Sequence, residues 1–484
     1  MNFPLVMKYI GVMLKVEAAA MLPAIVISLC RGEFKAASAL LFTFAITAAA
    51  SFLPLLKRPK SRRMSVRDGF LIVSLSWLIL SAFGALPFVL SGEIKSYVDA
   101  FFETVSGFTT TGATIVNDVE IMSRGLVYWR SFTHWLGGMG VLVFVLALVP
   151  KNEGVGGPIF VLRAESPGPV PDKLTPKIRD TAVALYAIYT ALTLLLVVLL
   201  VLGGMSVFDS FVTAFGTAGT GGFSSMNLSL GAWDSKYLQI VVGVFMVLFG
   251  VNFSIYFSIL RGRLRDVWRS DELKAYLIII AAATLAIAFN IAGSYPGFSE
   301  ALHQSFFQVA SIMTTTGFST ADFDLWPAFS KAILLVLMIV GACAGSTGGG
   351  VKVVRIVGVF RMAKNAVVRK LHPNAVTPVI VDGAAMSTDV SVGILEYLGI
   401  YFILCVASIL VVCFDTNDLI TSISGVLACI NNIGPGLGAL GPTCTYSGLS
   451  AVSKLVLSAD MLIGRLEIFP LLLIFTRSFW KKAA

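Results

Sequence analysis

The sequence predicts an all-α membrane protein in which one helix–loop–helix unit recurs four times after a leading pair of helices. Three observations support this prediction: an apolar composition, apolar runs from end to end, and basic residues that gather in alternate loops. Of the 484 residues, 57% are hydrophobic and only 13% are charged, with a mean hydropathy of +0.87. A water-soluble domain carries about 25% charged residues, so this chain lacks the polar surface that such a domain needs.

Apolar runs long enough to span a membrane recur along the whole chain. A spanning helix needs about 20 mostly apolar residues. The expected spans are 5–30, 35–56, 68–90, 125–149, 181–204, 237–260, 274–293, 330–345, 393–414 and 450–476. The first run carries Lys15 and Glu17 and lacks a small-residue cleavage pattern. We therefore expect a retained helix rather than a signal peptide.

The basic loops indicate the orientation of these spans. Short loops rich in Lys and Arg stay on the cytoplasmic side of a membrane. The basic segments are 57–67, 151–179, 261–269, 352–370 and 477–482. They fall on one side if both termini are cytoplasmic, and they account for the net charge of +9 without nucleic-acid binding. The opposite loops are rich in Asp and Glu, which would concentrate cations at the outer face.

A Gly-centred turn recurs about every hundred residues, each time after an apolar stretch too short to cross a membrane. The turns read TTTGAT at 109–114, TGGFSS at 220–225, TTTGFST at 314–320 and NNIGPGLG at 431–438. Their alignment superposes Gly112, Gly222, Gly317 and Gly434. Glycine permits a positive φ that turns consecutive carbonyls toward one axis, and rings of carbonyl oxygens replace the water around a dehydrating cation. The turns therefore predict a pore, since irregular backbone is tolerated at membrane depth where it lines water.

At these turns, and over nearly the whole chain, the sequence resembles the TrkH/TrkG/KtrB/HKT superfamily of potassium transporters, and most closely its TrkH branch. The leading helix pair is a further feature of that branch. The resemblance implies four M1–P-loop–M2 repeats around a central pore, preceded by this extra N-terminal pair. It divides the chain into the helix pair 1–62 and the repeats 63–150, 151–262, 263–370 and 371–484.

The resemblance assigns a potassium filter to three residues of each turn. These are Thr110, Thr111 and Gly112, Thr220, Gly221 and Gly222, Thr315, Thr316 and Gly317, and Asn432, Ile433 and Gly434. No turn holds the full T-V-G-Y-G strand of a potassium channel, and the fourth has Asn-Asn-Ile where the others have Thr or Gly. We therefore expect less uniform ion sites and weaker discrimination against sodium, while rubidium should pass.

The second span of the third repeat is interrupted by GACAGSTGGG at 341–350. Its five glycines make an unbroken helix costly, at up to about 1 kcal/mol each relative to Ala. It is not a phosphate loop, because Gly345 to Lys352 is one residue too long for G-x-x-x-x-G-K and no Ser or Thr follows the Lys. The resemblance instead implies an intramembrane loop that gates the pore. Its gate residues are Gly345, Ser346, Thr347, Gly348, Gly349 and Gly350.

Arg465 lies inside the last expected span, in MLIGRLEIFP. An intramembrane Arg is costly and by default functional, facing a cavity or a partner. The alternatives are snorkelling or a structural salt bridge to Glu467 or Asp460, although Arg465 and Glu467 are two residues apart and do not share a helix face. The resemblance implies that Arg465 projects beneath the filter toward the 341–350 loop as an electrostatic barrier.

The function that the resemblance implies is inward conduction of potassium and rubidium, gated by the loop and Arg465. It also implies a homodimer in a bacterial inner membrane, regulated by a separate cytosolic ring of the TrkA type that binds NAD or ATP. Membrane lipid is a further expected partner; potassium is the transported ion, and no motif in the chain calls for a cofactor of its own.

Two other functions stay open at this point. An obligatorily proton- or sodium-coupled symporter would use intramembrane carboxylates, for which Asp460 and Glu467 are the candidates. A membrane enzyme is less favoured, because the sequence holds no nucleophile–base pair and no Cys/His metal cluster.

Overall fold

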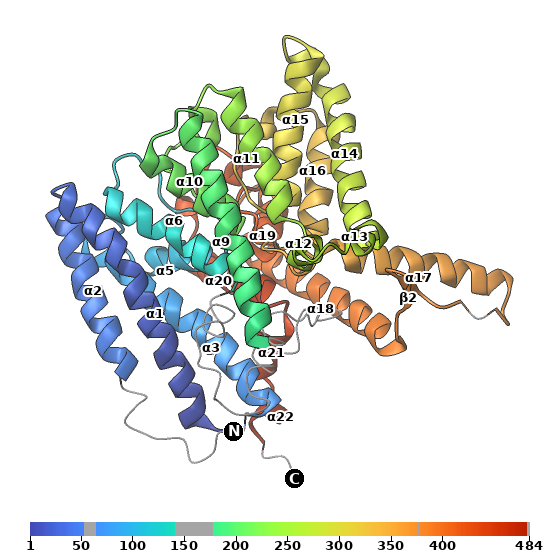
Figure 1. The fold of residues 1–484 in the computed structure, drawn as a ribbon, viewed down its shortest axis with the longest axis horizontal. Coiled ribbons are helices and arrows are strands. Elements are labelled where there is room, and N and C mark those ends of the chain that lie inside the picture. Colours follow the sequence, from blue (N-terminus) through green and yellow to red (C-terminus); the bar gives the residue numbers. More distant parts are fainter. Residues whose placement is uncertain (53–63, 141–177, 376, 482–484) are drawn as a thin grey trace.

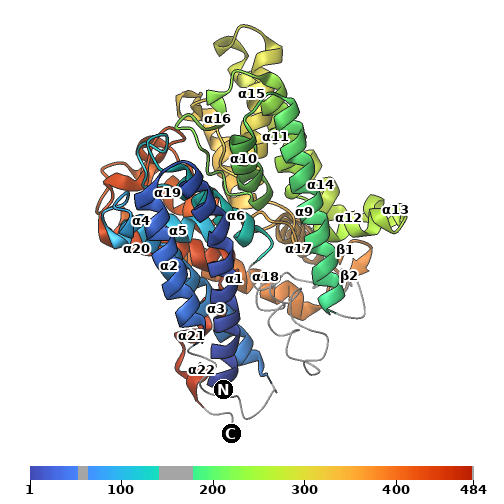
Figure 2. The same cartoon turned by 60° about the vertical axis from the view of Figure 1, so that its left-hand side comes forward.

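The computed structural model describes residues 1–52, 64–140, 178–375 and 377–481, and its regular structure there is almost entirely helical (Figure 1). The chain begins with a helical hairpin, α1 (Phe3–Cys30) and α2 (Phe34–Phe52). Asn2 caps α1 by accepting the N–H of Leu5 at 3.4 Å. The two helices lie side by side at one edge of the molecule (Figure 1, Figure 2).

Four units follow, each with a long helix, a short helix, a non-helical turn and a second helix. Unit 1 comprises α3 (Val66–Gly84), α4 (Leu86–Leu90), α5 (Tyr97–Phe108) and α6 (Arg124–Gly138). Unit 2 comprises α9 (Ile178–Leu202), α10 (Val207–Gly219), α11 (Lys236–Phe249), α12 (Phe253–Leu260) and α13 (Leu264–Arg269). Unit 3 comprises α14 (Asp271–Ile291), α15 (Phe298–Met313), α16 (Ala328–Val340) and α17 (Val353–Leu371). Unit 4 comprises α18 (Thr388–Val412), α19 (Leu419–Ile430), α20 (Ala451–Arg465), α21 (Phe469–Ile474) and α22 (Arg477–Trp480).

A small antiparallel hairpin, β1 (Ile380–Val381) and β2 (Ala384–Ala385), separates units 3 and 4. Ile380 pairs with Ala385 across it. The hairpin lies beside α17, which projects from the rest of the molecule (Figure 1).

Six helices in the described residues are long and apolar enough to cross a membrane, or seven if α11 and α12 count as one span. The short helices α5, α10, α15 and α19 have 12, 13, 16 and 12 residues. At about 1.5 Å per residue they reach at most about 24 Å, less than the hydrocarbon core of a bilayer. They are nevertheless largely buried within the protein, as expected for helices that enter a membrane without crossing it.

The second helices of all four units stop early, at Gly138, Phe249, Val340 and Arg465. The prediction of continuous spans at 237–260 and 450–476 is therefore wrong. Between α11 and α12 the direction changes by 90°. After α20, Glu467 and Ile468 have positive φ values of 51° and 72°, which end the helix. The break expected in the second span of unit 3 is present. In unit 1 the second span was expected at 125–149, and its residues 141–149 lie outside the described residues.

The break in unit 2 persists because the third unit satisfies its backbone groups. The carbonyl of Gly250 accepts the N–H of Cys343 at 3.1 Å, and the N–H of Phe253 donates to Gly345 at 3.0 Å. Asn252 caps the new helix α12 through the N–H of Ser254 at 2.9 Å. The loop of one unit thus replaces the helical hydrogen bonds that the other has lost.

Both termini lie on one face of the molecule (Figure 1, Figure 2). The backbone N–H of Asn2 donates to Asp68 at 2.8 Å, and Arg67 donates to the carbonyl of Lys481 at 2.5 Å. The start of α3 therefore holds the two ends of the chain together. Of the basic segments, 57–63 and 151–177 lie outside the described residues.

Candidate functional site

The four turns have the same backbone conformation. Each short helix ends at a residue other than Gly with positive φ: Thr110 (55°), Thr220 (53°), Thr315 (59°) and Asn432 (56°). Two residues later comes a Gly with positive φ: Gly112 (81°), Gly222 (75°), Gly317 (82°) and Gly434 (99°). The left-handed conformation is costly for residues other than Gly, so its repetition at corresponding places marks a conformation that the surroundings impose.

One hydrogen bond fixes each turn to its helix. The N–H of the residue just before the Gly donates to the carbonyl five positions earlier, from Thr111 to Ser106 (2.9 Å), Gly221 to Gly216 (2.8 Å), Thr316 to Ser311 (2.8 Å) and Ile433 to Ala428 (2.8 Å). This six-residue closure is the Schellman way of ending a helix. It places the negative end of each helix dipole next to the turn.

The turns contact one another in a closed order. A Cβ built on Gly112 would lie 2.0 Å from the carbonyl oxygen of Gly221, and one on Gly222 would lie 2.1 Å from that of Thr316. In the same way, Gly317 faces the carbonyl of Ile433 at 2.0 Å, and Gly434 faces that of Thr111 at 2.7 Å. In each turn, the carbonyl oxygen of the residue that precedes the Gly therefore faces the Gly of the preceding turn. The order is closed, because the oxygen from turn 1 faces the Gly of turn 4. We call the four oxygens of Thr111, Gly221, Thr316 and Ile433 the carbonyl ring.

The structure thus brings together all twelve residues predicted as a filter. Nine of the twelve are buried, and Gly112, Gly222 and Gly317 are partly exposed. On one side the ring opens to a cavity of about 210 Å³ that Gly112, Gly222, Gly317 and Gly434 line together with loop residues from all four units. Four convergent carbonyls at the narrow end of a cavity can coordinate a monovalent cation that has shed its water.

A buried ion pair, Glu103 with Arg130, supports turn 1 from behind. The two side chains are 0% and 5% exposed, and Arg130 Nε lies 2.6 Å from Glu103 Oε1. Glu103 also accepts the N–H of Ile115 at 2.9 Å and the hydroxyl of Thr114. Because Arg130 donates to the carbonyl of Ser224 at 3.3 Å, the pair joins turns 1 and 2.

His134 supplies a second link between units 1 and 2. Its Nδ1 lies 2.7 Å from the carbonyl of Gly107 in α5, and its Nε2 accepts the N–H of Phe223 at 3.3 Å. The first contact requires the proton on Nδ1 and the second leaves Nε2 as acceptor, so a neutral ring satisfies both. The imidazole is a positioning group behind the carbonyl ring.

The 341–350 loop lies directly beneath the ring. The N–H of Gly349 donates to Thr315 Oγ1 at 2.6 Å, and a Cβ on Gly349 would lie 2.3 Å from the carbonyl of Asn431. The N–H of Ala344 donates to Glu272 at 2.7 Å, which fixes the other side of the loop. Only glycine allows the backbone to approach the ends of α15 and α19 so closely. The loop therefore packs tightly against the inner ends of α15 and α19.

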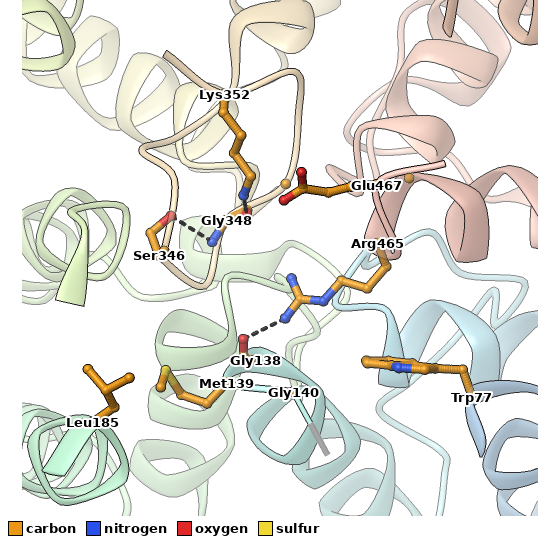
Figure 3. A pocket seen from close by; sticks show the side chains of 13 residues that line it. Trp77, Gly138, Met139, Gly140, Leu185, Ser346, Gly348, Lys352, Arg465 and Glu467 are labelled. Atoms are coloured by element: carbon orange, nitrogen blue, oxygen red, sulfur yellow. Dashed lines mark hydrogen bonds between the residues drawn. The ribbon is translucent and has the colours of Figure 1, made fainter. Parts of the chain in front are cut away.

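Arg465 points from the end of α20 at this loop (Figure 3). Its Nη1 donates to the carbonyl of Thr347 at 2.7 Å, and its Nη2 donates to that of Gly137 at 2.5 Å and to Gly138. A cavity of about 130 Å³ opens beside it, lined by residues of the loop and by Trp77, Met139 and Leu185. Arg465 thus connects the 341–350 loop of unit 3 with the end of α6 in unit 1 and the end of α20 in unit 4.

The two carboxylates considered as salt-bridge partners of Arg465 interact with other residues in the structure. Glu467 pairs with Arg355, and Asp460 accepts the hydroxyl of Ser408 at 2.8 Å. In the basic segment 352–370, Lys352 and Arg355 are buried within the protein, at 7% and 5% exposure. Lys352 donates to the carbonyl of Gly348 (Figure 3).

The acidic loops that the sequence predicts on the outer side are less negative than their composition suggests. Four of their carboxylates lie in salt bridges: Asp209 with Arg124, Glu300 with Lys236, Asp324 with Lys331, and Asp99 with Lys454. Asp118 instead accepts a hydrogen bond from Asn227 Nδ2 at 2.8 Å. This bond lowers the pKa of Asp118 below its ordinary value, so the carboxylate stays charged next to the outer cavity.

Comparison with known proteins decides the family. A model of the TrkH family, described as cation transport protein, matches residues 36–482. The chain belongs to the TrkH family. The family's members are named as transport proteins rather than enzymes, and the predicted all-α membrane fold is confirmed. The TrkH-family chain described here is accordingly a multi-pass membrane protein.

Several relatives match over most of their length. The Trk system potassium uptake protein TrkH of Salmonella typhimurium is 35% identical over 490 residues, 100% of both chains. That of Escherichia coli K12 is 36% identical over 446 residues, 91% of each chain. The TrkG protein of Escherichia coli K12 is 33% identical and covers 87% of this chain and 86% of its own. The crystal structure of the potassium transporter TrkH from Vibrio parahaemolyticus superposes with a TM-score of 0.89 at 33% identity, covering 99% and 100%.

Proposed function

We propose that this TrkH-family chain takes up potassium through the carbonyl ring. Its relatives bear the name potassium uptake protein. The observation that carries the proposal is the closed order of contacts in which each turn's Gly faces the next turn's carbonyl. Oxygens contributed by all four units are what a dehydrated monovalent cation requires. The filter is therefore assigned to the three residues at the centre of each turn.

The 341–350 loop and Arg465 form the gate in this proposal. The loop touches the inner ends of α15 and α19, so an ion leaving the ring meets it first. Arg465 holds the loop through Thr347 and places a positive charge on the path. Potassium passes when the loop moves away from the ring and from Arg465, driven by about 2.3 kcal/mol per charge for each 100 mV of membrane potential.

The setting of this transport is a bacterial inner membrane, with both termini in the cytoplasm. The two termini lie on one face of the molecule, and the basic residues Arg67, Arg477 and Lys481 lie near them in the chain or in contact with its end, which supports that orientation. Two copies of the chain form the transporting unit. A separate cytosolic ring of the TrkA type, which binds NAD or ATP, acts on the gate from this face.

Rubidium uptake tests the proposal. Purified protein in vesicles should take up rubidium when an inward-negative potential is applied. Potassium should compete fully and sodium poorly. The absence of flux, even with the regulatory ring added, would contradict the proposal.

A coupled mechanism is the second candidate, and Asp460 is the residue that favours it. Within the described residues its Oδ2 is buried without a hydrogen-bond partner. Its neighbour Met461 accepts the side-chain N–H of Asn432 in turn 4 at 2.9 Å. A proton on Asp460 would therefore change the charge next to the filter. Potassium uptake driven by a pH gradient at zero potential, and lost in Asp460→Asn, would establish coupling.

A further inference from the structure

A basic cavity lies at the end of α14 remote from the carbonyl ring. It has a volume of about 640 Å³ and is bounded by α13, α14, α17 and the β1–β2 hairpin. Four cationic side chains line it, against two carboxylates. The cations are Arg269, Lys274, Arg361 and Lys364, and the carboxylates are Asp271 and Asp382.

The two carboxylates are already engaged. Asp271 Oδ2 accepts from Arg361 at 2.9 Å and from the N–H of Asp382 at 3.0 Å. Asp382 Oδ1 in turn accepts the N–H of Asp271 at 2.6 Å. In the described part of the chain, no carboxylate lies within salt-bridge distance of Arg269, Lys274 or Lys364. The lining therefore carries more positive than negative charge, with three cations outside any salt bridge among the described residues.

The length of α14 indicates where the cavity lies relative to the bilayer. Its 21 residues extend about 31 Å, the thickness of a bilayer's hydrocarbon core. At its far end α14 leads into α15, the short helix that returns to turn 3. Arg269, the last residue of α13, and Lys274, in the first turn of α14, lie at the other end of α14. They would therefore lie at the level of the lipid headgroups on the opposite face of the bilayer.

The segment in front of the cavity has an apolar surface suited to the bilayer interface. Because α12 is turned by 90° from α11, the chain from α12 to α13 runs across the direction of the span (Figure 2). Leu260, Leu264 and Trp268 on this segment are 74%, 56% and 78% exposed. Aromatic and aliphatic side chains next to basic ones are typical of a membrane–water boundary.

We infer that this cavity binds the phosphodiester headgroup of an anionic phospholipid. The phosphate would lie among Arg269, Lys274 and Lys364, and the acyl chains would extend along Leu264 and Trp268. Basic pockets at the cytoplasmic ends of membrane helices recognise anionic headgroups in this way. Since β1–β2 and α17 form two walls of the cavity, the bound lipid would also hold α17, which continues directly from the 341–350 loop.

Lipid titration of the purified protein tests the inference. The full chain in a neutral detergent is mixed with phosphatidylglycerol or with phosphatidylcholine, and bound lipid is counted by native mass spectrometry. Thermal unfolding is followed in parallel. The double variant Arg269→Gln with Lys274→Gln should bind phosphatidylglycerol roughly 30-fold more weakly, from the usual contribution of two cations. The matched control, Arg263→Gln with Arg265→Gln, removes the same charge from α13 and its cap without altering the cavity.

Three results would overturn the inference. The first is equal binding of the two lipids by the unaltered protein. The second is an equal loss in both double variants, which would show only general charge attraction. The third is saturation by inorganic phosphate or glycerol 3-phosphate at the concentrations at which phosphatidylglycerol binds, which would assign the cavity to a soluble anion. Both readouts are independent of ion flux, so they stand whether or not the chain conducts potassium.

Discussion

Arg465 donates a hydrogen bond from Nη1 to the carbonyl oxygen of Thr347 at 2.7 Å, although the two residues are 118 positions apart. The same guanidinium holds Gly137 and Gly138. One side chain therefore ties the loop beneath the carbonyl ring to the ends of two second helices. In the proposed gate, these contacts define the closed state, and substitutions that remove them should weaken it.

Arg465→Gln should raise the rubidium flux of the purified protein. A hydrogen bond from a charged group contributes about 1.5–3 kcal/mol, so losing even one should favour loop opening about tenfold. Arg465→Lys separates the two roles, because Lys keeps the charge but loses the planar fork. A flux increase in Gln alone identifies an electrostatic barrier, and an increase in both identifies the tether. Arg477→Gln is the control, and unchanged flux in both Arg465 variants would contradict the gate.

The ion pair of Arg355 with Glu467 should behave as a coupled unit in unfolding experiments. The side chains are 6% and 12% exposed, so removing one leaves the other charged and buried. Arg355→Met and Glu467→Gln should each lower the free energy of unfolding by about 3–5 kcal/mol. The double variant should lose much less than their sum. Additivity within about 0.5 kcal/mol would show that the pair does not interact.

Glu103→Gln should destabilise turn 1 and reduce the selectivity for potassium. The substitution leaves Arg130 buried without a counter-charge, at a cost of about 3–5 kcal/mol. Thermal unfolding and sodium competition in the rubidium assay measure the two effects. Glu300→Gln is a matched control, since its partner Lys236 is 68% exposed and a surface pair contributes at most about 1 kcal/mol. Equal effects at the two positions would contradict a supporting role for Glu103.

Uptake should depend on Asp118 through its charge. The lowered pKa means that the ionised form is present above the ordinary carboxyl pKa of about 3.9 and is lost only as the pH falls through the still lower folded value. Asp118→Asn should therefore reduce uptake equally from pH 5 to 8, by less than about tenfold. The difference should shrink as salt screens the charge. A difference that disappears between pH 6 and 7 would be inconsistent with the lowered pKa.

The residues that the sequence predicted well are those with a local signal. The Gly at the centre of each turn could be aligned from spacing alone, and the five glycines of 341–350 predicted an interrupted helix. Arg465 stood out because a charge in an apolar run is costly. These features depend on residues a few positions apart, which a single sequence records directly.

The parts that were missed depend on contacts between distant residues. The break after Phe249 lies in a run of apolar residues, and it becomes favourable only because Cys343 and Gly345 hydrogen-bond its backbone. In the sequence, Lys352 and Arg355 look like part of an ordinary basic loop. Only the fold places Glu467, more than a hundred positions away, beside Arg355. Glu103 carried no signal except its position in an apolar stretch. Such pairings need the fold before they can be recognised.

The rubidium assay on Gly317→Ser shows whether the carbonyl ring selects the ion. A Cβ at Gly317 would lie 2.0 Å from the carbonyl of Ile433 at a φ of 82°, so the substitution must displace the ring. The control Gly399→Ala lies in α18, where, among the described residues and apart from the nearby backbone of its own helix, the added Cβ meets no atom within 4 Å. We predict that Gly317→Ser loses the preference for rubidium and potassium over sodium while Gly399→Ala keeps it. Unchanged selectivity in a folded Gly317→Ser protein would contradict selection by the carbonyl ring.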